Sequence, residues 1–412
     1  MEPKILIISN NALSTTSNNG KTLESFLHYF DKNRIAQLYL KNEIPDSIHC
    51  TNFFRITEYD LIKNFFNRKC CGEKIDNSKK NNNIIAQKSL KKNNILIFFR
   101  ELLWLIGPWK SQKLKKWLND IKPTHILFCA GDSLFAYRIA FFISKMFKSK
   151  FIVFYTDDYY FRKKNKNFLI RVYQHLIKKK IKKSINECDL LLTISDYMRM
   201  TYKKIFNKDS VVVANMPSLP TQIVSKHISN SKAYQLVYAG SLYYSRDKML
   251  FEIGEILDLI NQKYDTNHIL NIYTGSTIST QVNIPKSIRI NPSVNKEELN
   301  IIFQNSDIFV FVESYEESYT EKTRFSFSTK IPEYLSYRKC VLCYGPDTVG
   351  SIIYLKKVAY CITDKSTLYN DLIKLLNDEN LCKQIGKKCY TEFLDYKMKV
   401  NPKKIYNILC NL

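Results

Sequence analysis

The sequence contains no uncharged apolar run long enough to cross a lipid bilayer as a helix, which takes about 20 residues. Its two most apolar stretches, residues 93–109 and 133–147, are interrupted by arginine, lysine and glutamate. The N-terminus lacks a basic stretch followed by a long apolar core, so no signal peptide is expected. We therefore expect a cytosolic protein.

Signatures of nucleic-acid-binding and metal-binding modules are also missing. Neither a zinc-finger spacing nor an RRM-type aromatic pattern occurs. The 11 cysteines do not form the framework of a small secreted domain, which indicates reduced thiols. Cys340 and Cys343 have the spacing of a redox or zinc pair. They lie in an apolar run without a second pair nearby, which favours two buried strand residues.

A glycine is missing from the stretch that looks most like a nucleoside triphosphate loop. Gly20, Lys21 and Thr22 follow the first apolar run, as the end of a P-loop would. The P-loop pattern needs a glycine five residues before this Gly-Lys pair, and Thr15 stands there instead. The sequence therefore disfavours a nucleic-acid-stimulated ATPase.

Positive charge is abundant and unevenly distributed. The net charge is +25, and residues 1–233 hold 41 Lys and Arg against 18 Asp and Glu, whereas residues 234–412 hold 22 against 20. Residues 159–186 contain ten basic residues and no acidic one. Such a surface suits anionic lipid, an anionic lipid-linked substrate or nucleic acid, or it is simply a solvated lysine-rich surface. Because no nucleic-acid-binding signature is present, we expect an anionic membrane surface as the partner of the basic half, and no nucleic acid.

Short apolar runs alternate with helical patterns along the whole chain of 412 residues. Apolar runs without polar alternation, linked by helices, indicate parallel sheets covered on both faces. We predict an α/β fold of two Rossmann-like, doubly wound domains that face one another across a cleft. The expected segments are an N-terminal domain (1–217) with a polar, mobile excursion (68–95), a linker (218–233), a C-terminal domain (234–390), and closing helices (391–412) that pack back on the N-terminal domain.

A turn after the apolar run 235–239 has the chemistry of a phosphate site. Gly240 and Ser241 form a turn in which glycine lets a ligand approach the backbone. Arg246 and Lys248 follow at the expected start of a helix, where two cations can neutralise a diphosphate. A tight turn with solvated cations is the structural alternative.

A second candidate segment begins at Ser328. Ser328 and Thr329 can cap a helix whose first turn holds Lys330 and Glu333. A helix N-terminus offers unpaired N–H groups to a phosphate, and a carboxylate beside a cation is suited to bind ribose hydroxyls. The structural alternative for Glu333 is compensation of the helix dipole.

A family resemblance emerges from these segments. Residues 325–346 (FSFSTKIPEYLSYRKCVLCYGP) resemble the nucleotide-binding segment of retaining, family-4-type bacterial glycosyltransferases with the GT-B fold. Residues 237–250 (VYAGSLYYSRDKML) resemble their phosphate loop. Residues 17–27 (SNNGKTLESFL) resemble their polar loop after the first strand, whose glycine lies near the donor phosphates. The resemblance implies that Gly20 belongs to a donor site rather than to a P-loop.

The resemblance implies an enzyme that transfers a sugar from a UDP- or GDP-linked donor, which is a substrate and not a cofactor. The acceptor would be an oligosaccharide or a lipid-linked saccharide of capsule, O-antigen or lipooligosaccharide, at the inner face of the cytoplasmic membrane. Glu333 would hold the ribose. The family commonly has another glutamate eight positions earlier, where this sequence has Phe325. Backbone N–H groups of Phe327, Ser328 and Thr329 would then share the task of that glutamate.

The resemblance also assigns roles around the reacting bond. Asp157 or Asp158, after a strand of the acceptor-binding first domain, would bind the acceptor hydroxyl or act as a base, with a helix cap as the structural alternative. Arg246 and Lys248 would stabilise the leaving diphosphate with help from Lys330, so no metal is expected. A non-catalytic GT-B partner subunit and a GT-B-fold sugar-nucleotide epimerase remain open as alternatives.

Overall fold

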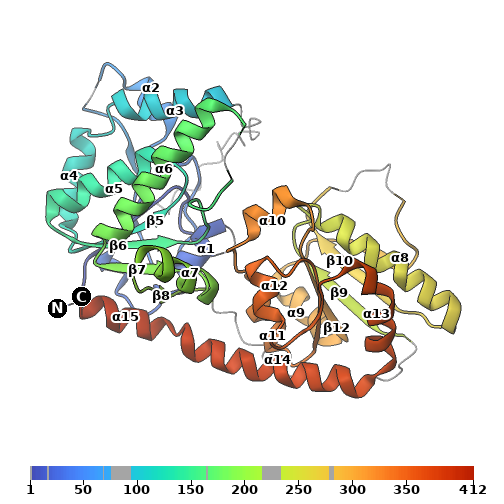
Figure 1. Ribbon diagram of the computed structural model, residues 1–412. Coiled ribbons are helices and arrows are strands. Elements are labelled where there is room, and N and C mark those ends of the chain that lie inside the picture. Colours follow the sequence, from blue (N-terminus) through green and yellow to red (C-terminus); the bar gives the residue numbers. More distant parts are fainter. Residues whose placement is uncertain are drawn as a thin grey trace. The chain divides into compact units, whose positions relative to one another are not determined.

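The computed structural model describes residues 2–15, 18–67, 69–75, 94–163, 166–215, 233–277 and 283–412 (Figure 1). The chain divides into two compact units. Unit 1 comprises Met1–Asn215 together with Val400–Leu412, and unit 2 comprises Met216–Lys399. Residues 218–232 of the expected linker lie outside the described residues, as do residue 68 and residues 76–93 of the expected excursion.

Unit 1 is built on an eight-stranded sheet with the strand order β4-β3-β2-β1-β5-β6-β7-β8. Neighbouring strands run parallel, except β3 and β4, which are antiparallel. The strands are β1 (Ile5–Ser9), β2 (Ile35–Tyr39), β3 (Asn52–Arg55), β4 (Glu73–Ile75), β5 (His125–Ala130), β6 (Lys150–Tyr155), β7 (Leu190–Thr193) and β8 (Val211–Val212). Every residue of β1, β2 and β5 is buried, as in the middle of a parallel sheet that is covered on both faces.

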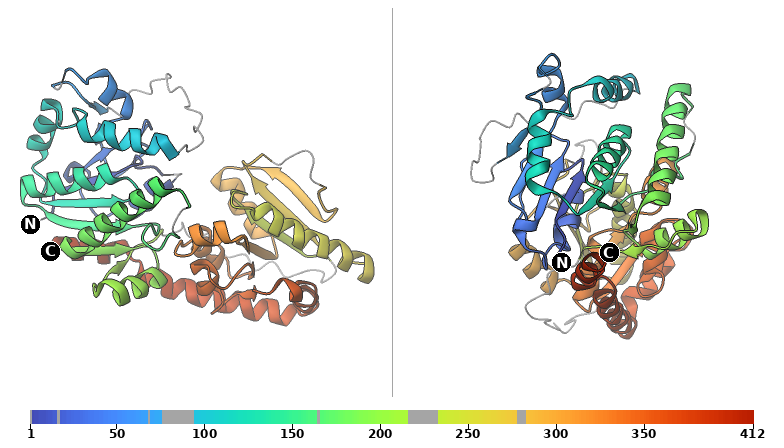
Figure 2. Two further views of the ribbon diagram at one scale, coloured as in Figure 1. Left: turned by 45° about the horizontal axis from the view of Figure 1, so that its top comes forward. Right: turned by 90° about the vertical axis from the view of Figure 1, so that its left-hand side faces the viewer.

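The helices of unit 1 begin where polar side chains can cap them. Ser111, Asn167 and Ser195 each accept a hydrogen bond from the first turn of the helix that follows. Figures 1 and 2 show α3, α5 and α6 as neighbours on this unit. The helices are α1 (Asn18–Ser25), α2 (Glu58–Lys63), α3 (Asn94–Ile106), α4 (Gln112–Ile121), α5 (Leu134–Phe147), α6 (Phe168–Glu187), α7 (Asp196–Phe206) and α15 (Pro402–Cys410), with a 3-10 turn at Lys32–Arg34.

The chain returns to unit 1 at its C-terminal end. Helix α15 starts with Pro402, whose missing N–H is not needed in a first turn, and Asn401 caps it. The ring of Tyr406 packs 4.9 Å from the ring of Phe30 and 6.5 Å from that of Tyr29, measured between centroids. Unit 2 is therefore inserted between two segments of unit 1.

Unit 2 has a six-stranded, fully parallel sheet with the order β11-β10-β9-β12-β13-β14. This is the 3-2-1-4-5-6 order of a Rossmann fold. Its strands are β9 (Gln235–Ala239), β10 (Ile269–Thr274), β11 (Ile288–Pro292), β12 (Ile308–Val312), β13 (Cys340–Tyr344) and β14 (Tyr360–Ile362). Its helices are α8 (Arg246–Tyr264), α9 (Lys296–Asn305), α10 (Glu317–Thr323), α11 (Lys330–Ser336), α12 (Gly350–Leu355), α13 (Leu368–Asn377) and α14 (Glu379–Lys399), with a 3-10 turn at Lys365–Thr367.

The predicted α/β class with two Rossmann-like sheets is confirmed. Cys340 and Cys343 are buried residues of β13, as their apolar surroundings predicted. Of the expected excursion at 68–95, the described residues include the short strand β4, at the edge of the unit 1 sheet. Among the described residues, no helix combines the length and the apolar character that crossing a bilayer would need.

Candidate active site

Two neighbouring strands of unit 2 bring together residues that lie far apart in the sequence. Strands β9 and β12 pair with each other, yet the chain continues from β9 to β10 on one side and from β12 to β13 on the other. Gly240 follows β9 and Glu313 follows β12. The carboxyl ends of strands at such a reversal form the crevice in which doubly wound folds bind ligands. This edge of the sheet is therefore the candidate site.

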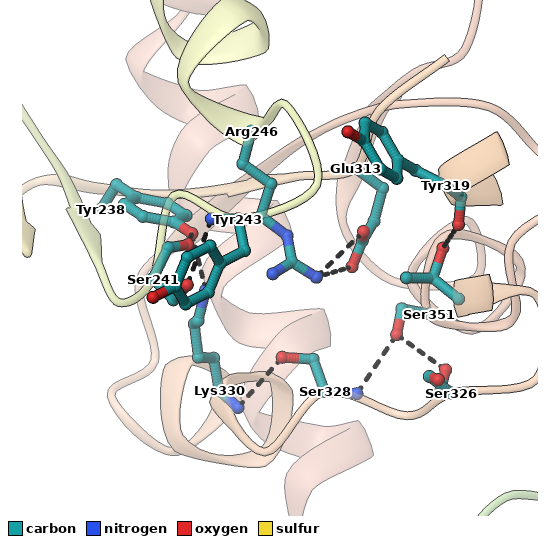
Figure 3. Close-up of polar contacts among 11 residues, drawn as sticks. Tyr238, Ser241, Tyr243, Arg246, Glu313, Tyr319, Ser326, Ser328, Lys330 and Ser351 are labelled. Carbon is teal, nitrogen blue, oxygen red and sulfur yellow. Dashed lines mark hydrogen bonds and ion pairs between the residues drawn. The ribbon is translucent and has the colours of Figure 1, made fainter. Parts of the chain in front are cut away.

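Arg246 and Glu313 form a buried ion pair at this edge (Figure 3). The Nη2 atom of Arg246 lies 3.0 Å from Oε1 and 3.1 Å from Oε2 of Glu313. The two side chains are only 15% and 3% exposed. Burial lowers the pKa of Arg246, but Glu313 and Tyr238 together raise that pKa above its ordinary value. Arg246 is thus a fixed cation whose charge Glu313 already balances.

Lys330, at the start of α11, supplies a second cation. It is half-buried, and its ammonium end points inward, where Nζ donates a hydrogen bond of 2.9 Å to the hydroxyl of Tyr238. That hydroxyl donates in turn to the carbonyl oxygen of Ser241, at 2.6 Å (Figure 3). Burial, together with the nearby charge of Arg246, lowers the pKa of Lys330 to about 7, and Glu313 opposes the shift. An anion bound beside Lys330 would therefore favour its protonation.

Gly240 makes room for Lys330. Its φ of +142° lies in the region that other residues rarely adopt. A Cβ at this position would lie 2.6 Å from Cε and 2.8 Å from Nζ of Lys330. The backbone N–H of Gly240 donates to the carbonyl of Tyr273, at 2.9 Å. The Lys330 side chain thus occupies the space beside Gly240, which also lines the pocket described next, and the approach of a donor to the Gly240 backbone stays a prediction.

A pocket of about 410 Å³ opens beside Lys330, with all its walls in unit 2. The walls come from the ends of β9 and β10, the segment before α9 and the first turn of α11. Lys330 and Glu333 line one side, and Tyr243 and Phe303 contribute aromatic surface. The volume lies within the range of about 300–1,000 Å³ that is usual for small-molecule sites. The pocket combines a carboxylate, a cation and aromatic rings, which is a suitable set for ribose, phosphate and base.

Lys248 differs from the two inner cations because it lies at the surface. Its Nζ atom pairs with Glu316 at 2.8 Å, and the side chains are 65% and 43% exposed. The turn before α8 is strained, because Tyr244 and Ser245 have φ values of 66° and 54°.

Within the part of the chain that the structure describes, no group of three or more His, Cys, Asp or Glu side chains is arranged to hold a metal ion.

The loop before α11 has its own internal support. Ser351 of α12 accepts a hydrogen bond from the N–H of Ser328, at 3.2 Å, and donates to the carbonyl of Ser326, at 3.1 Å (Figure 3). Ser328 was predicted to offer that N–H to the donor, and in this structure it is already bonded. Thr329 precedes the helix without a side-chain cap, while the Ser328 hydroxyl accepts from the N–H of Lys330 at 3.4 Å.

Two phenylalanines of the same loop serve packing. Phe325, at the position where the resemblance expects a glutamate, is only 2% exposed. Phe327 packs against Tyr354 and Tyr396, with ring centroids 5.0 and 5.8 Å away. Among the described residues, the carboxylate next to Arg246 is that of Glu313, which directly follows β12 and does not belong to this loop.

No protein-family model matches the chain, and no curated protein matches it by sequence. Solved structures do match it over its whole length. An α,α-trehalose 6-phosphate synthase from Burkholderia multivorans shares 10% identity, with a TM-score of 0.55 and coverage of 100% of this chain and 97% of that one. Anabaena HepE in complex with UDP-glucose shares 9% identity, with a TM-score of 0.58 and coverage of 99% and 98%. A glycosyltransferase from Rickettsia africae shares 12% identity, with a TM-score of 0.56 and coverage of 99% of both chains.

The chain has the GT-B fold. Unit 1 is its N-terminal Rossmann-like domain and unit 2 its C-terminal one. The arrangement of Arg246, Glu313 and Lys330 lies at the reversal of strand order in the C-terminal domain.

In the N-terminal domain of this GT-B fold, Gly20 lies inside a helix. Helix α1 begins at Asn18, and a Cβ on Gly20 would lie 2.2 Å from the carbonyl oxygen of Ala12. The glycine thus lets the segment after β1 pack closely on α1. Lys21, in the first turn of α1, is exposed. A place for Gly20 beside the donor stays a prediction.

The two aspartates after β6 have different surroundings. Asp158 accepts hydrogen bonds from the N–H groups of Tyr160 (3.1 Å) and Phe161 (2.9 Å) and from the hydroxyl of Tyr202 (2.9 Å). Burial raises the pKa of Asp158, and the Phe161 and Tyr202 hydrogen bonds oppose that rise. Asp158 therefore holds the turn after β6 together, and it caps no helix, because α6 begins at Phe168 and is capped by Asn167. A contact of Asp157 or Asp158 with an acceptor stays a prediction.

Sequence reasoning missed Glu313 and Tyr238 as site residues. Tyr238 lies in the apolar run of β9 and reads as a core residue. Glu313 directly follows an apolar strand, in a loop that the strand pattern does mark as a place for ligands. The only sign of Glu313 in the sequence was an acid at the carboxyl end of β12. Its partner Arg246 lies 67 residues away in the sequence.

Proposed function

We propose that this GT-B protein is a glycosyltransferase that moves a sugar from a nucleotide-sugar donor to a saccharide acceptor. The C-terminal domain would bind the donor, UDP- or GDP-linked, in the pocket beside Lys330. The N-terminal domain would bind the acceptor through Asp157 or Asp158, while Gly20 would lie near the phosphates of the donor. The transfer would retain the anomeric configuration, as in the family-4-type enzymes, and would not require a metal.

One observation carries this proposal. The pocket at the carboxyl ends of β9 and β10 contains Glu333, with the cation Lys330 one helical turn away, and Arg246 lies near enough to Lys330 to lower its pKa. A carboxylate suits the two ribose hydroxyls, and neighbouring cations suit the diphosphate that leaves during transfer. The HepE structure, which is similar in fold, is a complex with UDP-glucose.

The acceptor that we propose is a lipid-linked saccharide of a bacterial surface polysaccharide. Its support is the charge of residues 1–233, which carry 41 basic against 18 acidic residues. A basic surface is attracted to anionic lipid, at about 1 kcal/mol for each cation near the membrane. The protein would then act in the cytoplasm, peripherally at the inner face of the cytoplasmic membrane.

Isothermal titration with UDP, GDP, CMP and ATP, with and without magnesium, tests the donor site. We expect one nucleoside diphosphate to bind at micromolar concentration without magnesium. Glu333→Ala should weaken this binding by about tenfold or more, since it removes a carboxylate bonded to ribose hydroxyls. Glu255→Ala, at an exposed glutamate of α8, is the matched control. Magnesium-dependent ATP binding that survives Glu333→Ala would overturn the proposal.

A non-catalytic partner subunit is the second candidate, because Phe325 is buried where the resemblance expects a carboxylate. Binding alone does not separate the two candidates, but turnover does. The nucleotide sugar whose base the titration identifies is incubated with the protein and a lipid-linked saccharide acceptor, which takes up the sugar, and release of the nucleoside diphosphate is followed. Release above background, lowered in Glu333→Ala, supports the enzyme, whereas tight binding without release supports the partner subunit.

A further inference from the structure

Helix α3 of unit 1 is apolar on the side that it exposes. The apolar residues on this side are 48–63% exposed, and they are Leu96, Phe99, Leu102, Leu105 and Ile106. Trp104, on the opposite side, is fully buried. A surface helix normally shows polar residues to water and apolar ones to the core. The outer side of α3 therefore lacks the polar residues that would suit contact with water alone.

Helix α6 continues this surface. Its first half exposes Phe168, Leu169, Val172 and Leu176, at 39–66%. The two helices touch, because the hydroxyl of Tyr173 donates to the Glu101 carboxylate at 2.9 Å, and the Tyr173 ring lies 6.0 Å from that of Phe98.

The contact between the helices makes the two exposed sets neighbours. Leu102 lies four residues after Phe98 on α3, and Leu169 lies four residues before Tyr173 on α6. Residues four apart share one side of a helix, so both leucines lie one turn from the contact. We call the exposed apolar residues of the two helices the α3–α6 face.

The exposed charges on α6 beside the α3–α6 face are cations, whereas on the α2 side Arg100 of α3 is paired with Glu58. Arg171, Lys179, Lys182 and Lys183 are exposed on α6, and the Arg171 guanidinium lies 5.6 Å from the Phe168 ring. Helix α6 carries no acid before Glu187, near its C-terminal end.

The acid of α3, Glu101, is turned inward. Its carboxylate accepts the N–H groups of Leu134 (2.8 Å) and Phe135 (3.1 Å) at the start of α5. It does not offset the cations that border the α3–α6 face. An apolar surface bordered mainly by cations, with the neighbouring acid Glu58 already paired to Arg100, has the composition of a segment that lies in a membrane interface.

We propose that the α3–α6 face inserts into the headgroup region of an anionic bilayer. Apolar side chains would enter the acyl boundary, while the arginine and lysines extend to lipid phosphates. A second copy of this chain is a poorer occupant, because a two-fold contact would set the same cations of both copies against each other. This inference rests on the proposed membrane association and not on the donor chemistry. It adds the insertion of apolar side chains to the proposed attraction between the basic residues and anionic lipid.

Co-sedimentation with vesicles tests the proposal on the full-length protein. Neutral phosphatidylcholine vesicles are compared with vesicles containing about one third phosphatidylglycerol, at about 0.1 M and about 0.5 M salt. The variant Phe99→Ser/Leu102→Ser removes two exposed side chains of α3. Its control, Leu259→Ser/Ile301→Ser, removes two side chains of unit 2 that are 52% and 59% exposed.

We expect wild-type protein to prefer anionic vesicles and to keep part of its binding at high salt. Phe99→Ser/Leu102→Ser should bind about thirtyfold more weakly, from the apolar area lost, while the control pair binds like wild type. Equal vesicle binding by Phe99→Ser/Leu102→Ser and by the control pair would overturn insertion. Charge would then be the only source of the attraction to the membrane. Absence of vesicle binding would overturn the proposal too, with a dimer in light scattering indicating a second copy on the face. A fall in melting temperature confined to Phe99→Ser/Leu102→Ser would instead indicate cover by the chain itself. Nucleotide binding should be unchanged in Phe99→Ser/Leu102→Ser and in the control pair. Failure of the membrane proposal is therefore distinguishable from failure of the donor site.

Discussion

The variant Lys330→Gln should remove a pH dependence of nucleotide binding that the wild-type protein shows. The ammonium of Lys330 is held against Tyr238 and beside Arg246, and burial lowers the pKa of Lys330 to about 7. Near neutral pH this side chain is therefore charged in about half of the molecules. A diphosphate favours the charged form, so binding draws a proton onto Lys330.

The pKa sets the size of the effect. Between about pH 6 and about pH 8, a group with a pKa of about 7 goes from roughly nine tenths to roughly one tenth charged. If only the charged form binds, the dissociation constant of the diphosphate rises roughly tenfold over this range. The terminal phosphate of the ligand has its own pKa of about 6, and its ionisation works in the opposite direction. The variant isolates this ligand effect, because it lacks the lysine.

Titration of UDP and GDP at three pH values, in two buffers with different ionisation enthalpies, measures affinity and proton uptake together. Wild-type protein should take up a proton near pH 7 and bind more weakly as the pH rises. Lys330→Gln should bind weakly throughout, with only the ligand's pH dependence. Lys374→Gln, at an exposed lysine of α13, should behave like wild type.

The same pKa makes a prediction about stability. The unfolded chain keeps Lys330 protonated up to its ordinary pKa of 10.5, while the folded protein loses that proton near pH 7. Between these values the unfolded chain holds more protons, so the contribution of Lys330 to the free energy of unfolding rises with pH. Denaturant unfolding of Lys330→Gln should show a flatter rise over this window. Identical pH profiles for the variant and the wild type, in binding and in unfolding, would refute the titration of Lys330 in the site.

Three further substitutions and one control test the packing of the site and the helix after β1. Gly20→Ala places a Cβ 2.2 Å from a backbone oxygen, so we expect a loss of about 1–3 kcal/mol in the free energy of unfolding, while Lys21→Ala is nearly neutral in the same denaturation assay. Glu313→Ala leaves Arg246 buried without its partner, which should cost about 3–5 kcal/mol by denaturant titration; an unchanged midpoint would show that the pair is not buried in solution. Lys248→Ala should leave the unfolding midpoint unchanged, because its pair with Glu316 is exposed, so any loss of nucleotide affinity in that variant reports a lost ligand contact.

The central part of the fold could be predicted because its strands are continuous apolar runs. Ile5–Ser9 and Cys340–Tyr344 are buried at every position, and short runs of this kind that alternate with helices are typical of parallel strands. Strand β3, second from one edge of its sheet, and strand β11, at the edge of the other sheet, were missed. Asn52–Arg55 has two polar ends, and Ile288–Pro292 is largely exposed, so neither has the pattern of a buried strand.

The sequence indicated which types of residue belong to the candidate site, but not which side chains pair with each other. Arg246 and Lys330 were identified as cations near a donor, yet their difference in burial and charge depends on Glu313 and Tyr238. These partners are brought in by the order of strands in the sheet, which is a long-range property. A local pattern also gives no sign that the Lys330 side chain lies against Gly240.

The return of the chain to unit 1 has a consequence for the order of events during synthesis. Unit 2 ends at Lys399, whereas unit 1 needs residues up to Leu412, including the Tyr406 ring that packs on Phe30. A ribosome delivers the chain from its N-terminus, and domains fold as units once their residues have emerged. The inserted domain is therefore complete before the domain that surrounds it in sequence. Until the last turn of α15 leaves the ribosome, the nascent basic domain keeps an uncovered apolar patch around Phe30, and it is the later of the two to become resistant to proteases.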